Sequence, residues 1–266
     1  MKGAGSSYDE LVALRSKTVF ERATLLAASG DRSRLDMTAA HVLSLLERFP
    51  ALYREAWAIP STAGRPFARD GFDVGDGWFK LLDRLSAKLA VDPSNHIDQL
   101  KEKWGRLTVY FEREESVPRD LSLDAEMEAA IDEAEEESER TCLVCGEPGT
   151  IGRRGRWVTV LCGPCVQLFE IAETCRSIAE RLESLDLAAF SANETIQDAV
   201  RMELVYLGHA AAGQPPASRA RLPGIDWERL DQLKETKETK AVMVMPVGDL
   251  WRFASEEAPG LERKLR

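Results

Sequence analysis

The chain has 266 residues, of which 44% are hydrophobic and 30% charged, enough for one large or two ordinary folded domains. Its formal net charge of −10 argues against a protein that coats duplex DNA, because such a protein needs a basic surface to displace counterions. No stretch approaches the roughly 18 apolar residues of a membrane helix, and residues 1–7 lack the apolar region of a secretory signal. We therefore expect a cytoplasmic protein that does not contact a membrane.

Residues 1–60 are expected to form an N-terminal helical region, because apolar residues recur there at helical spacing. Residues 61–166 are expected to form a small α+β module. Within it, residues 78–89 predict a helix and residues 156–161 a short strand. Residues 106–112 predict a half-buried strand, because apolar and polar residues alternate.

An acidic segment follows this strand, with 13 acidic and 3 basic residues between Glu112 and Arg140. Apolar residues keep helical spacing within it, at Leu123, Met127 and Ile131. The segment therefore predicts a solvated amphipathic helix that packs through a narrow apolar stripe. A nucleic-acid mimic or an acidic partner surface is the alternative.

Four of the five cysteines form two Cys-x-x-Cys pairs separated by 16 residues: Cys142, Cys145, Cys162 and Cys165. Zinc takes four tetrahedral ligands, and this spacing lets both pairs of thiolates reach one ion. Because the cysteines would fill all four positions, the pattern predicts one structural Zn²⁺ ion per chain and not a catalytic ion.

A redox function is the alternative for Cys162-Gly-Pro-Cys165, which resembles the motif of thioredoxins and lies between a predicted strand and helix. The upstream pair and the absence of a βαβ pattern favour zinc. Gly146 and Gly163 are expected to permit tight turns. Cys175 is expected to be buried, because a free cysteine behaves as a small hydrophobic residue.

A basic segment, residues 152–157, lies between the two cysteine pairs. Arginine binds phosphate and tryptophan can stack on a base. The candidate nucleic-acid contacts are Arg153, Arg154, Arg156 and Trp157. A hairpin loop that only adds solubility is the alternative.

The central part of the chain carries two further motifs before the Cys142-x-x-Cys145-Gly knuckle. Residues 75–85 read GDGWFKLLDRL, and residues 99–111 read QLKEKWGRLTVYF. On these motifs, roughly residues 70–165 resemble a family of uncharacterised bacterial proteins. The resemblance implies a small α+β unit closed by zinc, and it implies no activity.

Residues 167–266 are expected to be helical, with Asp226 as the N-cap of a helix that starts at Trp227. Four motifs occur in order: residues 190–211 (FSANETIQDAVRMELVYLGHAA), residues 222–230 (LPGIDWERL), Asp249-Leu-Trp and Ala258-Pro-Gly-Leu. On these motifs the segment resembles the HepT-like branch of the HEPN superfamily. The resemblance implies an all-helical, dimeric domain, in a family that includes toxin ribonucleases partnered by nucleotidyltransferase antitoxins. The complete chain is then α+β and predominantly helical, with a zinc-braced module followed by a HEPN-like helical bundle.

The catalytic signature of that family is an arginine followed a few residues later by a histidine. Here Lys234 stands in the arginine's place and no histidine follows, because His209 is the last in the chain. Cleavage of RNA through its 2′-hydroxyl needs a group that titrates near neutrality. The resemblance therefore implies a fold that has lost its ribonuclease site, and no catalytic residue is assigned. Lys234, Lys237 and Lys240 are still candidates for binding phosphate. The alternative is that these lysines belong to an exposed segment of mixed charge that binds no ligand.

Three functions follow from these patterns. The first is a non-catalytic, zinc-containing interaction or regulatory protein of a bacterial toxin–antitoxin or antiviral defence system. Its partners would be a second copy of the chain and a toxin, antitoxin or nucleotidyltransferase. The second is an RNA- or nucleotide-binding protein that uses the basic segment and the lysine cluster. The third is a HEPN ribonuclease with a relocated active site formed by His209 and Lys234.

Overall fold

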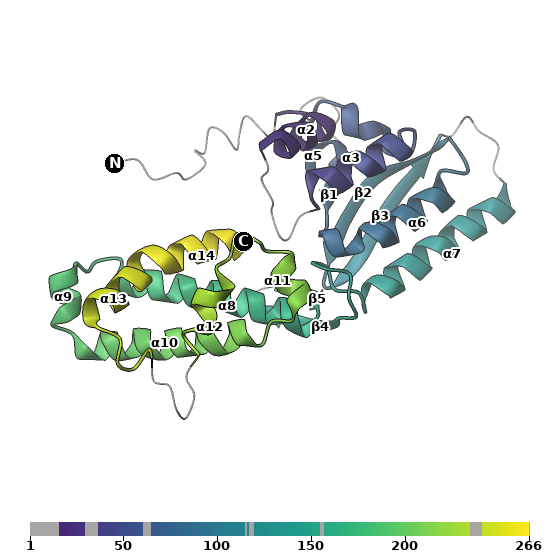
Figure 1. Ribbon diagram of the computed structural model, residues 1–266. Helices are drawn as coiled ribbons and strands as arrows, with labels where there is room; N and C mark the ends of the chain where they lie inside the picture. The colour runs from purple at the N-terminus through teal and green to yellow at the C-terminus, as the bar shows by residue number, and fades with distance from the viewer. Residues whose placement is uncertain are drawn as a thin grey trace. The chain divides into compact units, whose positions relative to one another are not determined.

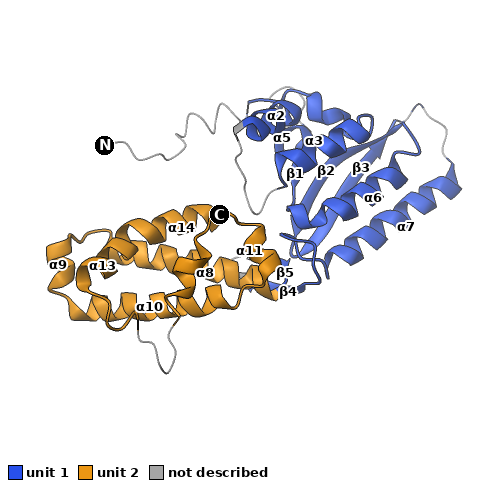
Figure 2. Ribbon diagram, in the orientation of Figure 1, with its two compact units in different colours: residues 1–162 blue, residues 163–266 orange. Residues whose placement is uncertain are grey.

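The computed structural model of the protein describes residues 16–29, 37–60, 65–114, 116, 120–154, 157–234 and 241–265. The chain divides into two compact units, Met1–Cys162 and Gly163–Arg266 (Figure 2). The structure is mixed α+β with helices predominating, as the sequence predicts (Figure 1). Among the described residues, none of the helices has both the length and the apolar character that a membrane span requires.

The first unit combines short helices with two small sheets. Its helices are α2 (Val19–Ser29), α3 (Ala39–Arg48), η1 (Arg54–Trp57), α5 (Pro66–Asp70), η2 (Asp76–Trp78), α6 (Phe79–Leu89) and α7 (Leu121–Ser138). Its strands are β1 (Phe72–Asp73), β2 (Asn95–Lys103), β3 (Arg106–Arg113), β4 (Thr150–Arg154) and β5 (Trp157–Leu161). The predicted helix over residues 78–89 is therefore confirmed as α6, and the two predicted strands as β3 and β5.

The larger sheet has the order β1-β2-β3, with β1 parallel and β3 antiparallel to β2. The β2–β3 register shifts between Ile97 and Gln99. Strand β2 was not predicted, because this irregularity breaks the alternation of apolar and polar residues along the strand. The smaller sheet is the antiparallel hairpin β4–β5, which lies between the two cysteine pairs.

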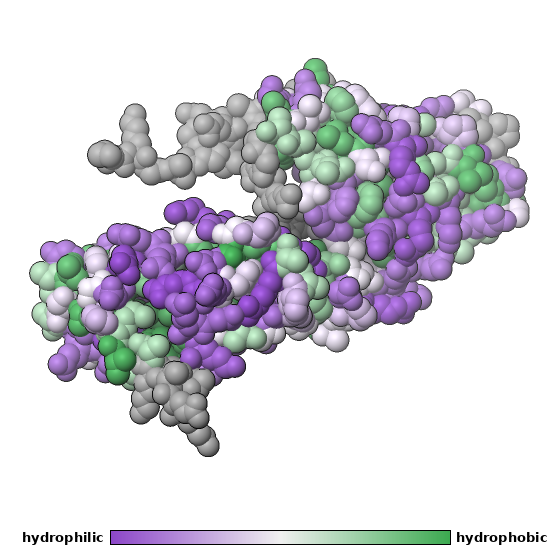
Figure 3. Space-filling model, viewed as in Figure 1, coloured by the Kyte–Doolittle hydropathy of each residue, from purple (hydrophilic) through white to green (hydrophobic). Residues whose placement is uncertain are grey.

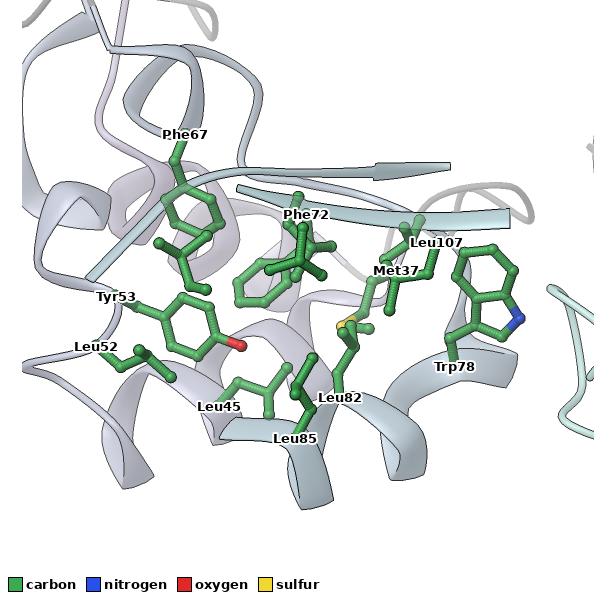
Figure 4. Close-up of a cluster of buried hydrophobic side chains, with 14 of the residues drawn as sticks. Met37, Leu45, Leu52, Tyr53, Phe67, Phe72, Trp78, Leu82, Leu85 and Leu107 are labelled. Atoms are coloured by element: carbon green, nitrogen blue, oxygen red, sulfur yellow. The ribbon is translucent and has the colours of Figure 1, made fainter. Parts of the chain in front are cut away.

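The core of the first unit lies between the larger sheet and the helices that cover one of its faces (Figure 4). Leu45 and Tyr53, from the expected N-terminal helical region, point into the same cluster as Phe72 of β1 and Leu107 of β3. The described part of residues 1–60 is thus built into the first unit. Within this core, the Tyr53 hydroxyl and the Ser86 hydroxyl lie 2.7 Å apart and form a hydrogen bond.

Helix α7 packs along the free edge of β3. Its apolar stripe is buried, including Met127 and Ile131, which confirms the predicted amphipathic helix. The N–H of Leu107 donates to Ser138 Oγ over 2.8 Å, and the N–H of Val109 donates to Glu135 Oε1 over 3.3 Å. Two side chains of α7 therefore accept the hydrogen bonds that a further strand would otherwise take.

Ion pairs neutralise part of the acidic surface of α7. Arg106 of β3 pairs with Glu135 and Glu139, and Lys88 of α6 pairs with Glu133. Such exposed pairs contribute little to stability. They do explain how so acidic a helix packs against its neighbours. Hydrophilic residues occupy much of the molecular face drawn in Figure 3, with smaller apolar groups between them.

His96 of β2 is a buried titratable residue, with 4% of its surface exposed. Arg54 Nη2 lies 2.7 Å from His96 Nδ1. Because a guanidinium can only donate, Nδ1 accepts and the neutral ring carries its proton on Nε2. Burial, and then the charge of Arg54, lower the pKa of His96 from its ordinary value of 6.5.

The second unit is helical. Its elements are α8 (Gly163–Leu182), α9 (Leu187–Ser191), α10 (Glu194–Ala212), α11 (Pro216–Ala220), α12 (Trp227–Asp231), α13 (Val247–Arg252), the π-helical stretch η3 (Phe253–Glu257) and α14 (Ala258–Leu265). The Asp226 side chain accepts a hydrogen bond from the N–H of Arg229 over 2.9 Å, which confirms the predicted N-cap.

Polar contacts hold the loops of the second unit onto its apolar core. Arg201 of α10 donates to the carbonyl oxygens of Val242 and Met245, over 2.6 and 2.9 Å. Gly208 of α10 permits a close crossing, because an added Cβ would lie 2.4 Å from the carbonyl carbon of Leu233. This crossing fixes the end of α12 against α10.

The free energy of unfolding is expected to fall as the pH drops from about 7.5 to about 5.5. The pKa of His96 lies below 6.5 in the folded chain, so the unfolded chain binds a proton that the folded chain does not. Urea unfolding at both pH values measures this effect, and His96→Gln should show a weaker pH dependence. His209→Gln is the matched control, because His209 is exposed. Any contribution of the cysteines to the pH dependence of stability is common to the wild type and both variants. An equal pH dependence in the wild type and His96→Gln would contradict the prediction.

Candidate metal centre

Four cysteine sulfurs gather at the base of the β4–β5 hairpin. The Sγ atoms of Cys142, Cys145, Cys162 and Cys165 all lie within 4.8 Å of one another. Zn–S bonds of about 2.3 Å in a tetrahedron place sulfurs about 3.8 Å apart, so the cluster fits one such ion. The cluster is therefore compatible with one structural metal ion such as Zn²⁺.

The four sulfurs lie mostly inside the protein. None of the four cysteines forms a disulfide, and three of them are buried. Cys145 is half-buried, and its Sγ lies 3.5 Å from that of Cys162, which belongs to the other pair. This gathering of both pairs around one point favours metal binding over the redox alternative, which needs only Cys162 and Cys165.

The first pair sits in a tight backbone turn. The N–H of Gly146 donates to the carbonyl oxygen of Cys142 over 2.9 Å, and the N–H of Cys142 donates to that of Glu147 over 2.8 Å. Gly146 has a φ of 76°, a conformation that favours glycine. The predicted role of Gly146 is thus confirmed.

The second pair is arranged differently. Cys162 directly follows β5, and Cys165 lies in the first turn of α8. Gly163, between them, does not have a positive φ, and an added Cβ would meet no atom within 4 Å. The backbone at Gly163 therefore does not require glycine, because the start of a helix already brings residues three apart onto one side.

The segment of residues 75–78 forms the seat of the first pair. The N–H of Gly77 donates to the carbonyl oxygen of Leu143 over 2.9 Å, and the indole N–H of Trp78 donates to that of Thr141 over 2.9 Å. An added Cβ on Gly77 would lie 2.0 Å from the carbonyl oxygen of Cys142. The two backbones therefore touch, and only glycine fits between them.

Arg221 is a contact of the cluster that was not predicted from the sequence. Its Nη2 lies 3.9 Å from Cys165 Sγ and 3.3 Å from Ser218 Oγ. Four thiolates around a divalent ion carry a net negative charge, so a neighbouring guanidinium is favourable. Arg221 lies 56 residues after Cys165, and no sequence pattern connects the two.

Cys175 is a core residue of the second unit. It is fully buried in α8, as predicted. Burial, with a smaller effect of Glu262, raises the pKa of its thiol to about 12. Cys175 therefore stays protonated and unreactive near neutral pH.

The predicted basic contacts lie partly within the described residues. Arg153 is exposed on β4, and Arg154 and Trp157 pair with each other at the ends of β4 and β5. Lys234 is exposed after α12. Arg156, Lys237 and Lys240 lie outside the described residues.

His209 lies exposed in the last turn of α10. The preceding residue, Gly208, packs against the backbone of Leu233 and Lys234. This places His209 on a helix that contacts the segment carrying Lys234. The contact is made by backbone atoms and is explained by helix packing.

Substitution of Gly77 by alanine is expected to weaken metal binding, because the added methyl group displaces the carbonyl of Cys142 and with it the first pair. Competition with a chromogenic zinc chelator measures the affinity, and we expect a loss of about tenfold or more. Gly163→Ala is the matched control, since Gly163 lies between two of the cysteines and has open space around it. Equal affinities of the two variants would show that the seat does not position the sulfurs.

Comparison with protein-family models, curated proteins and solved structures found no match to this chain. The resemblances of roughly residues 70–165 and of residues 167–266 therefore stay predictions. What the structure itself provides is a four-cysteine cluster seated on a glycine-containing turn.

Proposed function

We propose that the protein is a non-catalytic interaction protein in which one zinc ion closes residues 142–165. The observation that carries this proposal is the four-sulfur cluster. When bound, zinc supplies a cross-link between the two cysteine pairs and fixes the hairpin between them. Four thiolates occupy every tetrahedral position, so no position is left for a reactive water molecule.

The geometry supports a structural role for the cluster. Its sulfurs are held by a hydrogen-bonded turn, by the seat at Gly77 and by the start of α8. A catalytic zinc site keeps an open coordination position and a path for substrate. Here Cys142 and Cys165 have exposed fractions of 0% and 1%. The hairpin β4–β5 is then the part of the protein that the ion holds in place for contact with a partner.

The proposal includes a degenerate HEPN-like domain formed by the second unit. Its helical architecture is compatible with the resemblance, and the chain has no histidine after His209. On this proposal the second unit forms a homodimer, and the protein acts in a toxin–antitoxin or antiviral defence system. Its acidic balance would suit a basic protein partner such as a toxin, because opposite charges favour association.

Native mass spectrometry of freshly purified, untagged protein is expected to show one zinc ion per chain, in a dimer. The single variants Cys142→Ser and Cys162→Ser should lose zinc, because each removes one of four ligands. Cys175→Ala is the matched control and should retain the ion, since Cys175 lies in the core of α8.

A fresh chain without metal, in which Cys162 and Cys165 are joined by a disulfide, would overturn the zinc assignment in favour of the redox alternative. Purification under reducing, oxygen-free conditions excludes oxidation as the cause. A zinc-loaded monomer would leave the cluster as proposed and remove the dimer.

A further inference from the structure

Trp104 is an exposed tryptophan in an unfavourable backbone conformation. It lies in the turn between β2 and β3, and 68% of its surface is exposed. Trp104 and Gly105 have φ values of 58° and 82°, as in the two-residue hairpin turns that prefer Asn-Gly or Asp-Gly. Among the described residues, Trp104 is the only non-glycine residue with a positive φ.

Neither packing nor local conformation explains a tryptophan at this position. The ring gains little from burial, and a bulky side chain in the left-handed region carries a conformational cost. Residues that violate local preferences in this way are concentrated at functional sites. The position therefore suggests that the exposed ring itself is used.

The β4–β5 hairpin lies directly beside this turn. Ile151 Cδ1 is 2.8 Å from the point where a Cβ on Gly105 would lie, so β4 packs against the turn. Ile151 is 55% exposed. Arg153 lies two residues further along β4, on the same face of the strand, and is also exposed.

Residues of both charges lie near Trp104, and the cation directly beside it is Lys103, which is exposed. The acidic neighbour Glu102 turns back, and its carboxylate accepts a hydrogen bond from the N–H of Gly105. The same end of the sheet carries Lys101, whose Nζ lies 5.5 Å from the ring centroid of the half-exposed Tyr110.

From these contacts we infer that single-stranded nucleic acid binds the hairpin surface, defined as Lys103, Trp104, Ile151 and Arg153. A base would stack on the ring of Trp104, with Ile151 beside it, and the two cations would contact phosphates. This inference rests on the zinc-braced interaction protein proposed above, because two of the four residues lie on the hairpin that the metal closes.

The composition of the surface favours a single strand over other occupants. In a duplex the bases already stack on one another and cannot reach a protein ring. A protein partner of the usual kind buries a contiguous apolar patch, whereas here two apolar residues lie between cations. An aromatic residue with one cation beside it and another on the adjacent strand suits the alternation of base and phosphate along a single strand.

Fluorescence anisotropy with a fluorescein-labelled single-stranded RNA of mixed sequence, about 20 nucleotides long, tests the inference on the zinc-loaded full chain. Trp104→Asn is expected to weaken binding about tenfold, because the stacking platform is lost. Its melting temperature should stay equal or rise, since asparagine suits the turn. A general loss of folding would instead lower both the affinity for RNA and the melting temperature. Trp57→Phe is the matched control, because Trp57 is also exposed, at 42%, and lies outside the hairpin surface.

The two cations give a second, independent readout. For the double variant Lys103→Ala and Arg153→Ala, the slope of log affinity against log salt should fall by about 1.4, or about 0.7 for each phosphate contact. Zinc is measured in the same samples. A zinc-loaded wild type that does not bind the RNA at low salt, or that binds it equally well after Trp104→Asn, overturns this inference and leaves the proposed function intact. A protein partner whose capture is lost in Trp104→Asn, without RNA binding, also overturns it, whereas a wild type without zinc overturns the proposed function.

Discussion

The contact between residues 75–78 and the first cysteine pair is the constraint on which the metal centre depends. At Gly77 the two backbones approach so closely that a single methyl group would lie 2.0 Å from the Cys142 carbonyl oxygen. Hydrogen bonds from Gly77 and from the Trp78 indole hold neighbouring carbonyls of the same turn. The turn that precedes α6 therefore constrains the positions of the sulfurs from outside the cluster, and the proposed zinc ion would hold them from within. Packing of α6 into the core then connects the cluster to the rest of the first unit.

The cysteine cluster could be predicted because its information is local. Two residues between cysteines, and one loop between pairs, suffice to indicate a tetrahedral thiolate site. The seat could not be predicted, because Trp78 and Thr141 are 63 residues apart and no periodic pattern joins them. In the sequence the seat corresponds to the GDGW motif at residues 75–78. The resemblance to a family of uncharacterised proteins rests partly on this motif but implies no role for it. No pattern in the sequence indicates that Arg221 contacts the cluster.

The same distinction applies to the fold. Strand β3 keeps strict alternation and was predicted, whereas the shift between Ile97 and Gln99 hides β2 from any test for a period of two. The apolar stripe of α7 was equally visible. The hydrogen bonds that Glu135 and Ser138 of α7 accept depend on where this helix lies against β3. Only the tertiary structure shows that position.

The position of α7 also bears on the aggregation resistance of the protein. A sheet grows by adding a strand to an edge with free backbone donors. On one edge of the larger sheet, the donors of Leu107 and Val109 are already taken by side chains of α7. The other edge differs, because β1 covers β2 only at Leu100 and Lys101. Strand addition beside β3 would thus require α7 to detach, so the sheet is protected against fibril-like growth at this margin.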